Sequence, residues 1–402
     1  MTRIEKGLVV VAFVLWSAMM IGAGYAGRML LAPVEVRTER TYASNSHALL
    51  DEAWGHVRDH FIGAVPSDTV RDYGAVRGAL ATLNDRYTTF IEPQPRALER
   101  DHMRGSFGGI GVSFAQNERG EIVLTPRADG PAARAGVREG DILVSIDGVP
   151  LPAAAAFDDV ARIRGEVGTS VTIEVLRGPQ RERLSFTIIR QIIEIDSVTW
   201  RPITTTVGDA PAAIGYLRIS NFTERTGKEV REAISALTAA NSQAYLIDLR
   251  DNGGGSLASA IDVASAFLGD GAVVAIEKRR SQPEIVHRAH GRRSQATDGR
   301  PVVVLVNGNT ASAAEIVAGA IQDHGRGLLV GEKTFGKGSV QLIFDLTGGS
   351  AVRVTTAKWL TPERRELDGV GLVPDVEAGG AADAQLERAV SLLSDALGRQ
   401  AR

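Results

Sequence analysis

The sequence predicts a multidomain α+β protein with an N-terminal helical segment, a small β-rich domain, and an α/β core built on a mainly parallel sheet. Its 402 residues exceed what one ordinary hydrophobic core holds. Short β-branched runs separated by glycine turns occupy residues 105–190, and strands alternate with helices beyond residue 191. Such alternation is typical of a parallel sheet covered by helices. We expect five regions, residues 1–34, 35–100, 101–190, 191–380 and 381–402.

The charge balance and the absence of cysteine exclude several classes of function. The chain has 45 Lys+Arg against 48 Asp+Glu, for a formal net charge of −3, so it offers no broad basic surface for nucleic acid. No cysteine is present, which rules out thiol nucleophiles, Cys-ligated metals and disulfides. A chain without thiols also fits an oxidising compartment.

Residues 8–27 form an uncharged apolar run that follows Arg3 and Lys6. About 20 helical residues at 1.5 Å rise match the roughly 30 Å hydrocarbon core of a membrane. The basic residues before the run would keep the N-terminus cytoplasmic. The run therefore predicts a membrane anchor, with the remaining chain exported to a periplasmic or other extracytoplasmic space. A signal peptide cleaved after Ala26 is the alternative.

The next region predicts a small helical subdomain. Apolar side chains recur at helical spacing in residues 47–65, and residues 75–83 supply a second helix. Pro93 and Pro95 are expected to stop regular structure after it.

The β-rich domain combines five predicted strands with two short helices. The helices are expected at residues 131–136, which read PAARAG, and at 157–164. The strands are expected at residues 108–114, 121–125, 141–151, 169–177 and 183–189. This order of elements resembles a PDZ domain of the bacterial protease type.

The resemblance assigns peptide binding to the GGIGV run, which comprises Gly108, Gly109, Ile110, Gly111 and Val112. Successive backbone N–H groups in a glycine-rich turn can hold a terminal carboxylate, and an exposed strand edge can pair with an extended peptide. Taken without the neighbouring PAARAG element, the same glycines are equally well explained as a simple turn.

Two features of the α/β core lie outside its alternating elements. The polar stretch at residues 279–300 is interpreted as a surface insertion, with a mobile flap as the alternative. Residues 381–398 predict an amphipathic helix whose apolar stripe would dock on the core, formed by Leu386, Val390, Leu393 and Leu397.

Three segments of the core carry the candidate chemistry: DLRDNGGG at 248–255, VNGNTASAAEI at 306–316 and GEKTFGKGSVQ at 331–341. Together they resemble the tail-specific, or C-terminal processing, peptidase family of serine proteases. The similarity extends over residues 47–376. It implies a ClpP/crotonase-like core in which Ser312 is the nucleophile, Lys337 is the general base and Gln341 orients that lysine. It implies no metal and no other cofactor.

The residue types suit these roles. Ser312 follows a buried strand and opens a helix, whose N-terminus stabilises developing negative charge. Lys337 can act as a base only when its amine is neutral, so its pKa must fall from ~10.4 towards ~7–8. We expect Phe335 and Val340 to wall an apolar pocket around it. Gln341 can accept a hydrogen bond from the amine without adding a negative charge that would raise the pKa.

The expected oxyanion hole combines the backbone N–H of Ala313 with one from the glycine loop, for which we choose Gly254. Members of the family commonly have a proline where this chain has Gly253. The flexibility of a third glycine leaves the second donor open.

Each candidate residue also has a purely structural interpretation. Ser312 and Glu315 form a capping-box pattern that explains a helix start without chemistry. Lys337 alone could be a solvated turn residue, and Gln341 an ordinary strand residue. The catalytic interpretation depends on their joint presence.

The histidines suggest two other sites that the spacing disfavours. His56 and His60 stand at i,i+4, but no further ligand pattern accompanies them, so a solvated helix face is favoured over a metal pair. His324 beside Asp323 would complete a Ser-His-Asp site, but it ends the helix that Ser312 begins, about 18 Å away at 1.5 Å per residue.

The sequence thus predicts an exported serine endopeptidase that recognises substrate C-terminal tails through its PDZ-like domain and uses a Ser-Lys dyad. The resemblance suggests that peptide occupancy switches the dyad into a competent arrangement, with Arg164 as a candidate relay. Its expected partners are polypeptides with exposed C-termini and the membrane; a homo-oligomer or an activating protein stays open. The alternatives are an inactive membrane-tethered PDZ scaffold and an acyl-CoA enzyme of crotonase-like fold.

Overall fold

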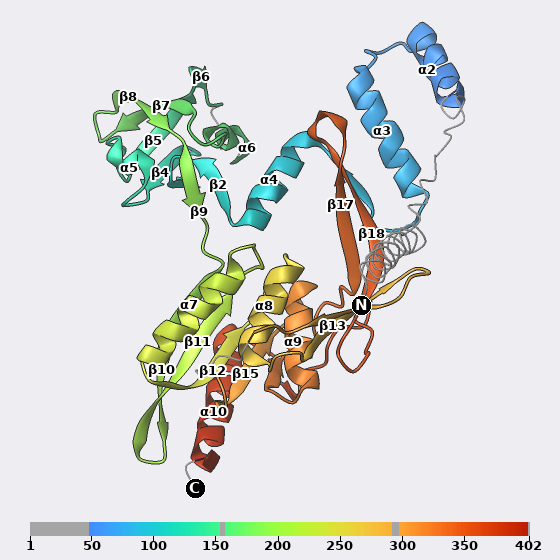
Figure 1. The fold of residues 1–402 in the computed structure, drawn as a ribbon. Helices are drawn as coiled ribbons and strands as arrows, with labels where there is room; N and C mark the ends of the chain where they lie inside the picture. Colours follow the sequence, from blue (N-terminus) through green and yellow to red (C-terminus); the bar gives the residue numbers. More distant parts are fainter. Residues whose placement is uncertain (1–47, 153–156, 292–296, 401–402) are drawn as a thin grey trace, which may run out of the picture. The chain divides into compact units, whose positions relative to one another are not determined.

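The computed structural model describes residues 48–152, 157–291 and 297–400 (Figure 1). The predicted membrane anchor at residues 8–27 lies outside the described residues. Within the described ranges, every helix is too short or too polar to span a bilayer. By internal contacts the chain divides into two compact units, residues 1–68 and 69–402.

Two helices without buried residues begin the described chain. Helix α2 (Ala48–His60) belongs to the first unit, and α3 (Asp68–Ala81) begins at the boundary and continues in the second. Helix α3 starts seven residues before the segment predicted at 75–83, because a mainly polar helix gives little apolar periodicity to mark its first turns.

The expectation that Pro93 and Pro95 stop regular structure is wrong. Pro93 begins helix α4 (Pro93–Arg104), directly after the short strand β1 (Thr89–Ile91). Proline is tolerated in the first helical turn, since the N–H that it lacks would have no partner there. Helix α4 therefore connects β1 to the β-rich domain, and it ends at Gly105 in the left-handed conformation (φ 69°).

The β-rich domain contains an antiparallel sheet in the order β3–β4–β5–β7–β8, with β6 paired to β5. Strand β3 has a neighbour on one side only. Short helices α5 (Pro131–Arg134), α6 (Phe157–Val160) and η1 (Ala161–Ile163) accompany the sheet. The strands run over Val112–Gln116, Ile122–Pro126, Asp141–Ile146, Val149–Pro150, Ser170–Arg177 and Glu182–Ile189.

A two-stranded ribbon lies at the two ends of this domain. Strand β2 (Ser106–Gly109) enters it and pairs antiparallel with β9 (Gln191–Glu194), which leaves it. Gly108 is required here, because a Cβ at this position would lie 2.0 Å from the carbonyl oxygen of Gly165.

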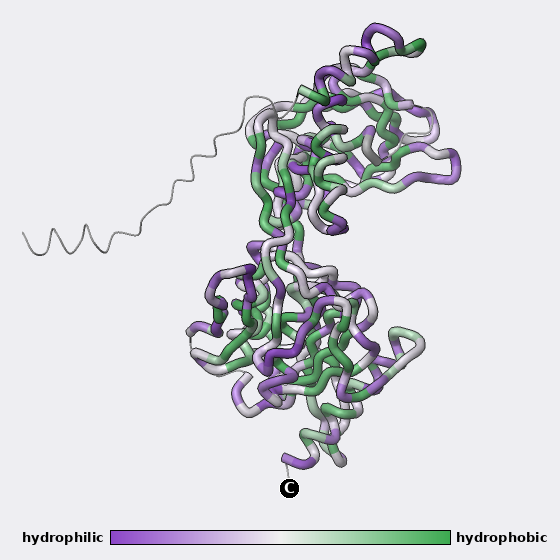
Figure 2. The backbone as a smooth tube through the Cα atoms, turned by 90° about the vertical axis from the view of Figure 1, so that its right-hand side faces the viewer, coloured by the Kyte–Doolittle hydropathy of each residue, from purple (hydrophilic) through white to green (hydrophobic). Residues whose placement is uncertain are grey.

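The α/β part is built on a six-stranded sheet in the order β10–β11–β12–β15–β16–β19. Strand β10 is antiparallel to β11, and every other neighbouring pair is parallel. Figure 2 shows hydrophobic segments gathered inside this part. The strands run over Val198–Val207, Ala210–Ile219, Ser242–Asp248, Val302–Val306, Leu328–Gly331 and Val376–Glu377.

Helices cover both faces of the parallel sheet. Side chains such as Ile247 and Val304 pack in one core with α7 (Thr226–Ala239), α8 (Leu257–Phe267) and α9 (Ala313–Asp323). Their neighbours along the strands, such as Leu246, pack in a second core with α10 (Ala382–Gln400). Within the predicted stripe of α10, Leu393 and Leu397 are buried, and Leu386 and Val390 are partly buried against the same core.

A second, antiparallel sheet of the core was not predicted. Its order is β1–β18–β13–β14, with β17 also paired to β18. The expected insertion at residues 279–300 contributes its edge strand β14. The strands β13, β14, β17 and β18 run over Val273–Arg279, Ile285–Arg288, Ser339–Asp345 and Ala351–Leu360.

Candidate active site

Ser312 lies in the turn that joins β15 to α9. Its backbone angles, φ 57° and ψ −119°, are unusual for a residue other than glycine. The preceding residue fastens the turn to the glycine loop, because Ala311 N–H donates to the carbonyl of Asn252 at 2.9 Å. The turn presents a partly exposed serine at the start of a buried helix.

Glu315, one turn into α9, is fully buried and connects this serine to the lysine segment. Its Oε2 accepts the backbone N–H of Ser312 at 2.9 Å and that of Lys337 at 2.8 Å. Its Oε1 accepts the hydroxyl of Thr334 at 2.6 Å and the N–H of Gly336 at 2.8 Å. Glu315 therefore makes the hydrogen bond that a capping box expects of its glutamate, to the backbone N–H of Ser312. The same carboxylate also binds a segment about twenty residues farther along the chain.

Lys337 is half-buried just before β17, and its Nζ lies 5.3 Å from the centre of the Tyr87 ring. Burial, helped by the charge of Arg353, holds the pKa of the Lys337 amine below its ordinary value, whereas Glu99 acts in the opposite direction. Phe335 does not wall this site as expected, since 51% of it is exposed. Val340 is partly buried against the main core.

Hydrogen bonds between the predicted catalytic side chains are absent from the described part of the structure. Among the described residues, no hydrogen bond joins Ser312 Oγ to Lys337 Nζ. Gln341 Nε2 donates to Ser339 Oγ at 2.7 Å, and none of its hydrogen bonds in the described chain goes to the lysine. The main chains at positions 312 and 337 are close, whereas the lysine amine is turned towards Tyr87.

The glycine loop lies against the nucleophile turn. A Cβ on Gly254, whose φ is +100°, would stand 2.8 Å from Ser312 Cβ and 3.0 Å from Ala313 N. Only glycine fits so close to the turn. The N–H of Gly254 donates to Asn252 Oδ1 at 2.8 Å. For the N–H of Ala313, the other expected oxyanion donor, the described part of the chain supplies no acceptor.

A buried ion pair beneath the glycine loop was missed at the sequence level. Arg250 binds Asp248 through both Nε (2.9 Å) and Nη2 (2.6 Å), and Tyr216 also donates to that carboxylate at 2.8 Å. The hydrogen bonds that the guanidinium donates to Asp248 raise the pKa of Arg250. Arg250 Nη1 reaches the carbonyl of Ala382 at 2.6 Å, so the pair also fastens the start of α10. The DLRD segment indicates such a pair, because Asp248 and Arg250 stand two residues apart at the end of a strand.

The structure gives the positions of the histidines of the two alternative sites. His324 lies at the far end of α9 from Ser312, and its Nε2 binds the carbonyl of Val273 at 2.8 Å. The rings of His56 and His60 stack with centres 6.1 Å apart. No group of three or more potential metal ligands occurs among the residues that the structure describes.

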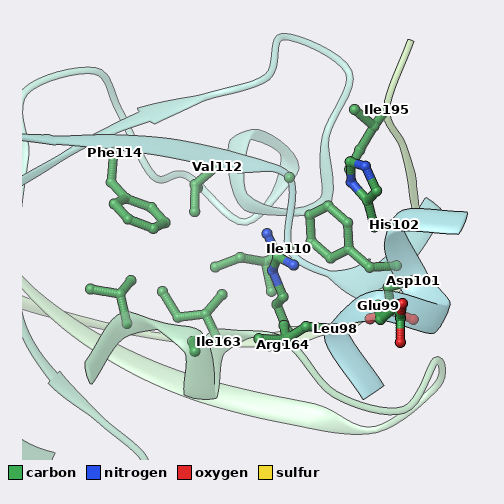
Figure 3. Close-up of a pocket in the computed structure, with 14 residues that line it drawn as sticks. Leu98, Glu99, Asp101, His102, Ile110, Val112, Phe114, Ile163, Arg164 and Ile195 are labelled. Carbon is green, nitrogen blue, oxygen red and sulfur yellow. The ribbon is translucent and has the colours of Figure 1, made fainter. Parts of the chain in front are cut away.

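The β-rich domain contains an apolar pocket of ≈ 510 Å³ next to the GGIGV run (Figure 3). Ile110, Gly111 and Val112 line it, and Ile163 closes it from η1. Gly108 lines a neighbouring cavity instead, and Gly109 is buried in β2. The pocket thus adjoins β3, which pairs only with β4 among the described strands.

The rim of this pocket carries charged side chains from two elements. Figure 3 shows Glu99, Asp101 and His102 reaching it from α4 and Arg164 from the end of η1. Arg164 lies 4.1 Å from the centre of the Phe107 ring, a cation–π contact at the pocket wall.

Comparison with known proteins finds a matching family for the α/β part and another for the β-rich domain. Peptidase family S41 matches residues 213–378, and the PDZ domain matches residues 108–188. A carboxy-terminal-processing protease of Bartonella bacilliformis is 35% identical over 361 residues, which cover 87% of this chain and 80% of that protein. A carboxyl-terminal-processing protease of Synechocystis sp. is 33% identical over 366 residues, covering 87% and 84%. The solved structure of a photosystem II D1 C-terminal processing protease is 30% identical, covers 86% of this chain and 92% of that one, and superposes with a TM-score of 0.50.

The fold and these matches define a serine peptidase that carries a PDZ domain. The chain belongs to the carboxy-terminal-processing proteases of peptidase family S41.

Proposed function

We propose that the chain is an exported endopeptidase that binds the C-terminus of a polypeptide in its PDZ pocket and cleaves the chain with Ser312 as nucleophile and Lys337 as base. One observation carries the proposal. The backbone N–H groups of both residues donate to the same oxygen of Glu315, so the two nitrogens can be no farther apart than the sum of those hydrogen bonds. Side chains that extend from such neighbouring positions can reach each other by rotation alone.

The chemistry follows from these positions. A neutral Lys337 amine takes the proton of Ser312 as Oγ attacks the scissile carbonyl carbon, and the protonated amine then gives a proton to the leaving amine. Water, deprotonated by the same lysine, attacks the acyl carbonyl carbon, and the protonated lysine returns the proton to Ser312 Oγ as the carboxylic acid leaves. The oxyanion would lie between the N–H groups of Ala313 and Gly254. The lowered pKa of Lys337 supports its role as a base.

The arrangement described here is a resting one in this proposal. Lys337 lies over Tyr87, Gln341 donates to Ser339, and the N–H of Gly254 is engaged by Asn252. Binding of a substrate tail would turn Lys337 towards Ser312, with Gln341 accepting a hydrogen bond from the amine. The N–H of Gly254 would leave Asn252 and point at the oxyanion.

The features of the pocket support a substrate tail with an apolar C-terminal side chain. Its floor is formed by Ile110, Val112 and Ile163, and the adjacent glycine turn offers backbone N–H groups to a carboxylate. The uncharged run at residues 8–27 supports retention at a membrane, with the peptidase on its extracytoplasmic side.

The test is cleavage of an unfolded protein and of a tail-bearing peptide by the full-length chain in detergent. Ser312→Ala and Lys337→Ala should each lower turnover by more than about a thousandfold. Lys228→Ala, a change at an exposed lysine on α7, is the matched control and should retain activity. Equal turnover in wild type and both active-site variants would exclude the dyad. Tail binding without cleavage by the wild type would favour the inactive PDZ scaffold.

A further inference from the structure

Helix α4 touches both the peptide pocket and the surroundings of the catalytic lysine. Glu99, at its middle, lines both the peptide pocket and a second cavity of ≈ 460 Å³. In that second cavity its Oε1 forms an ion pair with Nη2 of Arg353 on β18. One carboxylate therefore belongs to the wall of the tail pocket and to the peptidase core.

Arg353 lies beside the site where the lysine amine rests. Arg353 pairs with Thr89 in the β1–β18 ladder, and the N–H of Thr355 binds the hydroxyl of Thr88 at 3.1 Å. Tyr87, whose ring lies against the Lys337 amine, directly precedes Thr88. The charge of Arg353 lowers the pKa of Lys337 and the charge of Glu99 raises it, although burial is the larger influence.

One oxygen of the Glu99 carboxylate lacks a hydrogen-bond donor among the described residues. Its Oε2 is buried and accepts no hydrogen bond from the described residues, although Arg96 Nη1 forms an ion pair with it at 3.5 Å. A buried carboxylate oxygen without a donor costs free energy. A donor or a cation brought by a bound tail would therefore compete readily with Arg353 for this carboxylate.

We propose that Glu99 is a positioning residue that couples occupancy of the tail pocket to the catalytic lysine by holding or releasing Arg353. This inference depends on the proposed function of Lys337 as the base. In the empty pocket Glu99 offsets the charge of Arg353, and the amine stays protonated over Tyr87. A bound tail draws Glu99 away, the charge of Arg353 then acts on the amine without compensation, and the neutral base is favoured.

Other charged groups lie near the lysine, and Asp85, Lys358 and Asp368 line one cavity together with Tyr87. Arg86 lies over the Tyr87 ring, 4.6 Å from its centre, and so adds a second cation near the amine. Glu315 is saturated by hydrogen bonds from four donors, including the backbone N–H of Lys337. Of the charged groups described around the amine, Glu99 is the carboxylate that also lines the tail pocket.

The experiment measures the protonation of Lys337 directly. The full-length Ser312→Ala protein in detergent is labelled competitively with acetic anhydride across a pH series, and acetylation at Lys337 is read by mass spectrometry. The probe is a synthetic peptide with an apolar C-terminal residue and a free carboxylate; its C-terminal amide is the negative control. The series is repeated with Glu99→Gln, Arg353→Gln and, as a matched control at an exposed Glu-Arg pair, Glu284→Gln.

The two substitutions should move the lysine in opposite directions. Without peptide, Glu99→Gln should raise the labelling rate at fixed pH by about three- to tenfold and Arg353→Gln should lower it by a similar factor. Peptide should raise the rate in the reference protein and in Glu284→Gln, and much less in Glu99→Gln. Shifts of the same sign in the two variants, or an undiminished peptide effect in Glu99→Gln, would overturn the coupling.

Failure of the coupling can be told from failure of the catalytic proposal. Labelling needs no turnover, so it reports the coupling whatever the activity. Cleavage by the Ser312→Ala or Lys337→Ala protein at the wild-type rate would reject the dyad. If those variants are inactive and the labelling shifts are absent, the dyad stands and the role of Glu99 falls.

Discussion

The backbone N–H groups of Ser312 and Lys337 donate to one and the same carboxylate oxygen, Oε2 of Glu315, at 2.9 and 2.8 Å. The two residues are separated by a helix and a strand in the sequence. A buried acid in α9 is therefore the part of the fold that sets the spacing between the proposed nucleophile and the proposed base. Because its four donors come from residues 312–337, both segments depend on this one side chain.

Replacing that carboxylate with its isosteric amide should impair both activity and folding. In Glu315→Gln an amide NH₂ would replace one acceptor oxygen and face at least one backbone N–H donor, so at least one of the four hydrogen bonds is lost. We expect a loss of roughly 2–4 kcal/mol in the free energy of unfolding and more than about a hundredfold in kcat/KM. Urea unfolding and peptide cleavage measure the two effects. Glu284→Gln, at an exposed pair, should change neither, and a fully active Glu315→Gln protein would contradict the account.

Adjacent glycines offer a matched pair of substitutions. In Gly254→Ala the new methyl would lie 2.8 Å from Ser312 Cβ at a φ of +100°, whereas a Cβ on Gly253 meets nothing within 4 Å. Gly254→Ala should lower stability by about 1–3 kcal/mol and should displace the nucleophile turn enough to abolish most activity. Gly253→Ala should be nearly neutral in both assays. Similar behaviour of the two variants would show that the loop does not pack on the turn as described.

The pKa of Lys337 predicts a pH dependence of stability with a definite sign. Because burial lowers the pKa of the amine in the folded protein, the unfolded chain binds more protons between the folded pKa and ~10.4. The lysine therefore makes stability rise with pH through that interval. Lys337→Met removes this contribution, so its stability relative to wild type should be greatest at neutral pH and should decline towards pH ~10.4. Thermal unfolding across the pH series measures the difference, and a difference that grows with pH would contradict the assignment.

Filling the tail pocket should separate recognition from chemistry. Ala161 lines the pocket on η1, and Ala161→Phe would occupy space that the tail needs. Cleavage of a peptide with a free C-terminus should fall by about tenfold or more, whereas acylation of Ser312 by a small activated ester, measured without any tail peptide, should keep the basal rate of the wild type. Ala135→Phe, at an exposed position outside the pocket lining, is the control. Equal loss with both substrates would indicate damage to the fold instead.

The local patterns of the sequence predict much of the fold but few of its long-range contacts. The PDZ-like strands, the alternation around Ile247 and Val304, and the stripe of α10 follow from periodicity, which depends on neighbouring residues. The capping pattern of Ser312 and Glu315 also predicts one contact that the structure contains. Proline at position 93 was misjudged because the same residue that interrupts a helix also begins one.

What escaped prediction joins residues far apart in the chain. The sequence shows an acid at position 315 but not that residues 334–337 return to it. It shows a tyrosine at position 87 but not that a lysine 250 residues later rests on its ring. The second sheet was missed for the same reason, since β1 pairs with β18 across most of the chain.

The most direct test of Ser312 as nucleophile and Lys337 as base is acid-quenched mass spectrometry of the full-length protein during turnover of a slowly hydrolysed peptide ester. We expect an acyl group on Ser312 in the wild type, and none on that residue in Lys337→Ala after the same time. Turnover with an acyl group on another residue, or acylation of Ser312 at the wild-type rate without Lys337, would contradict it.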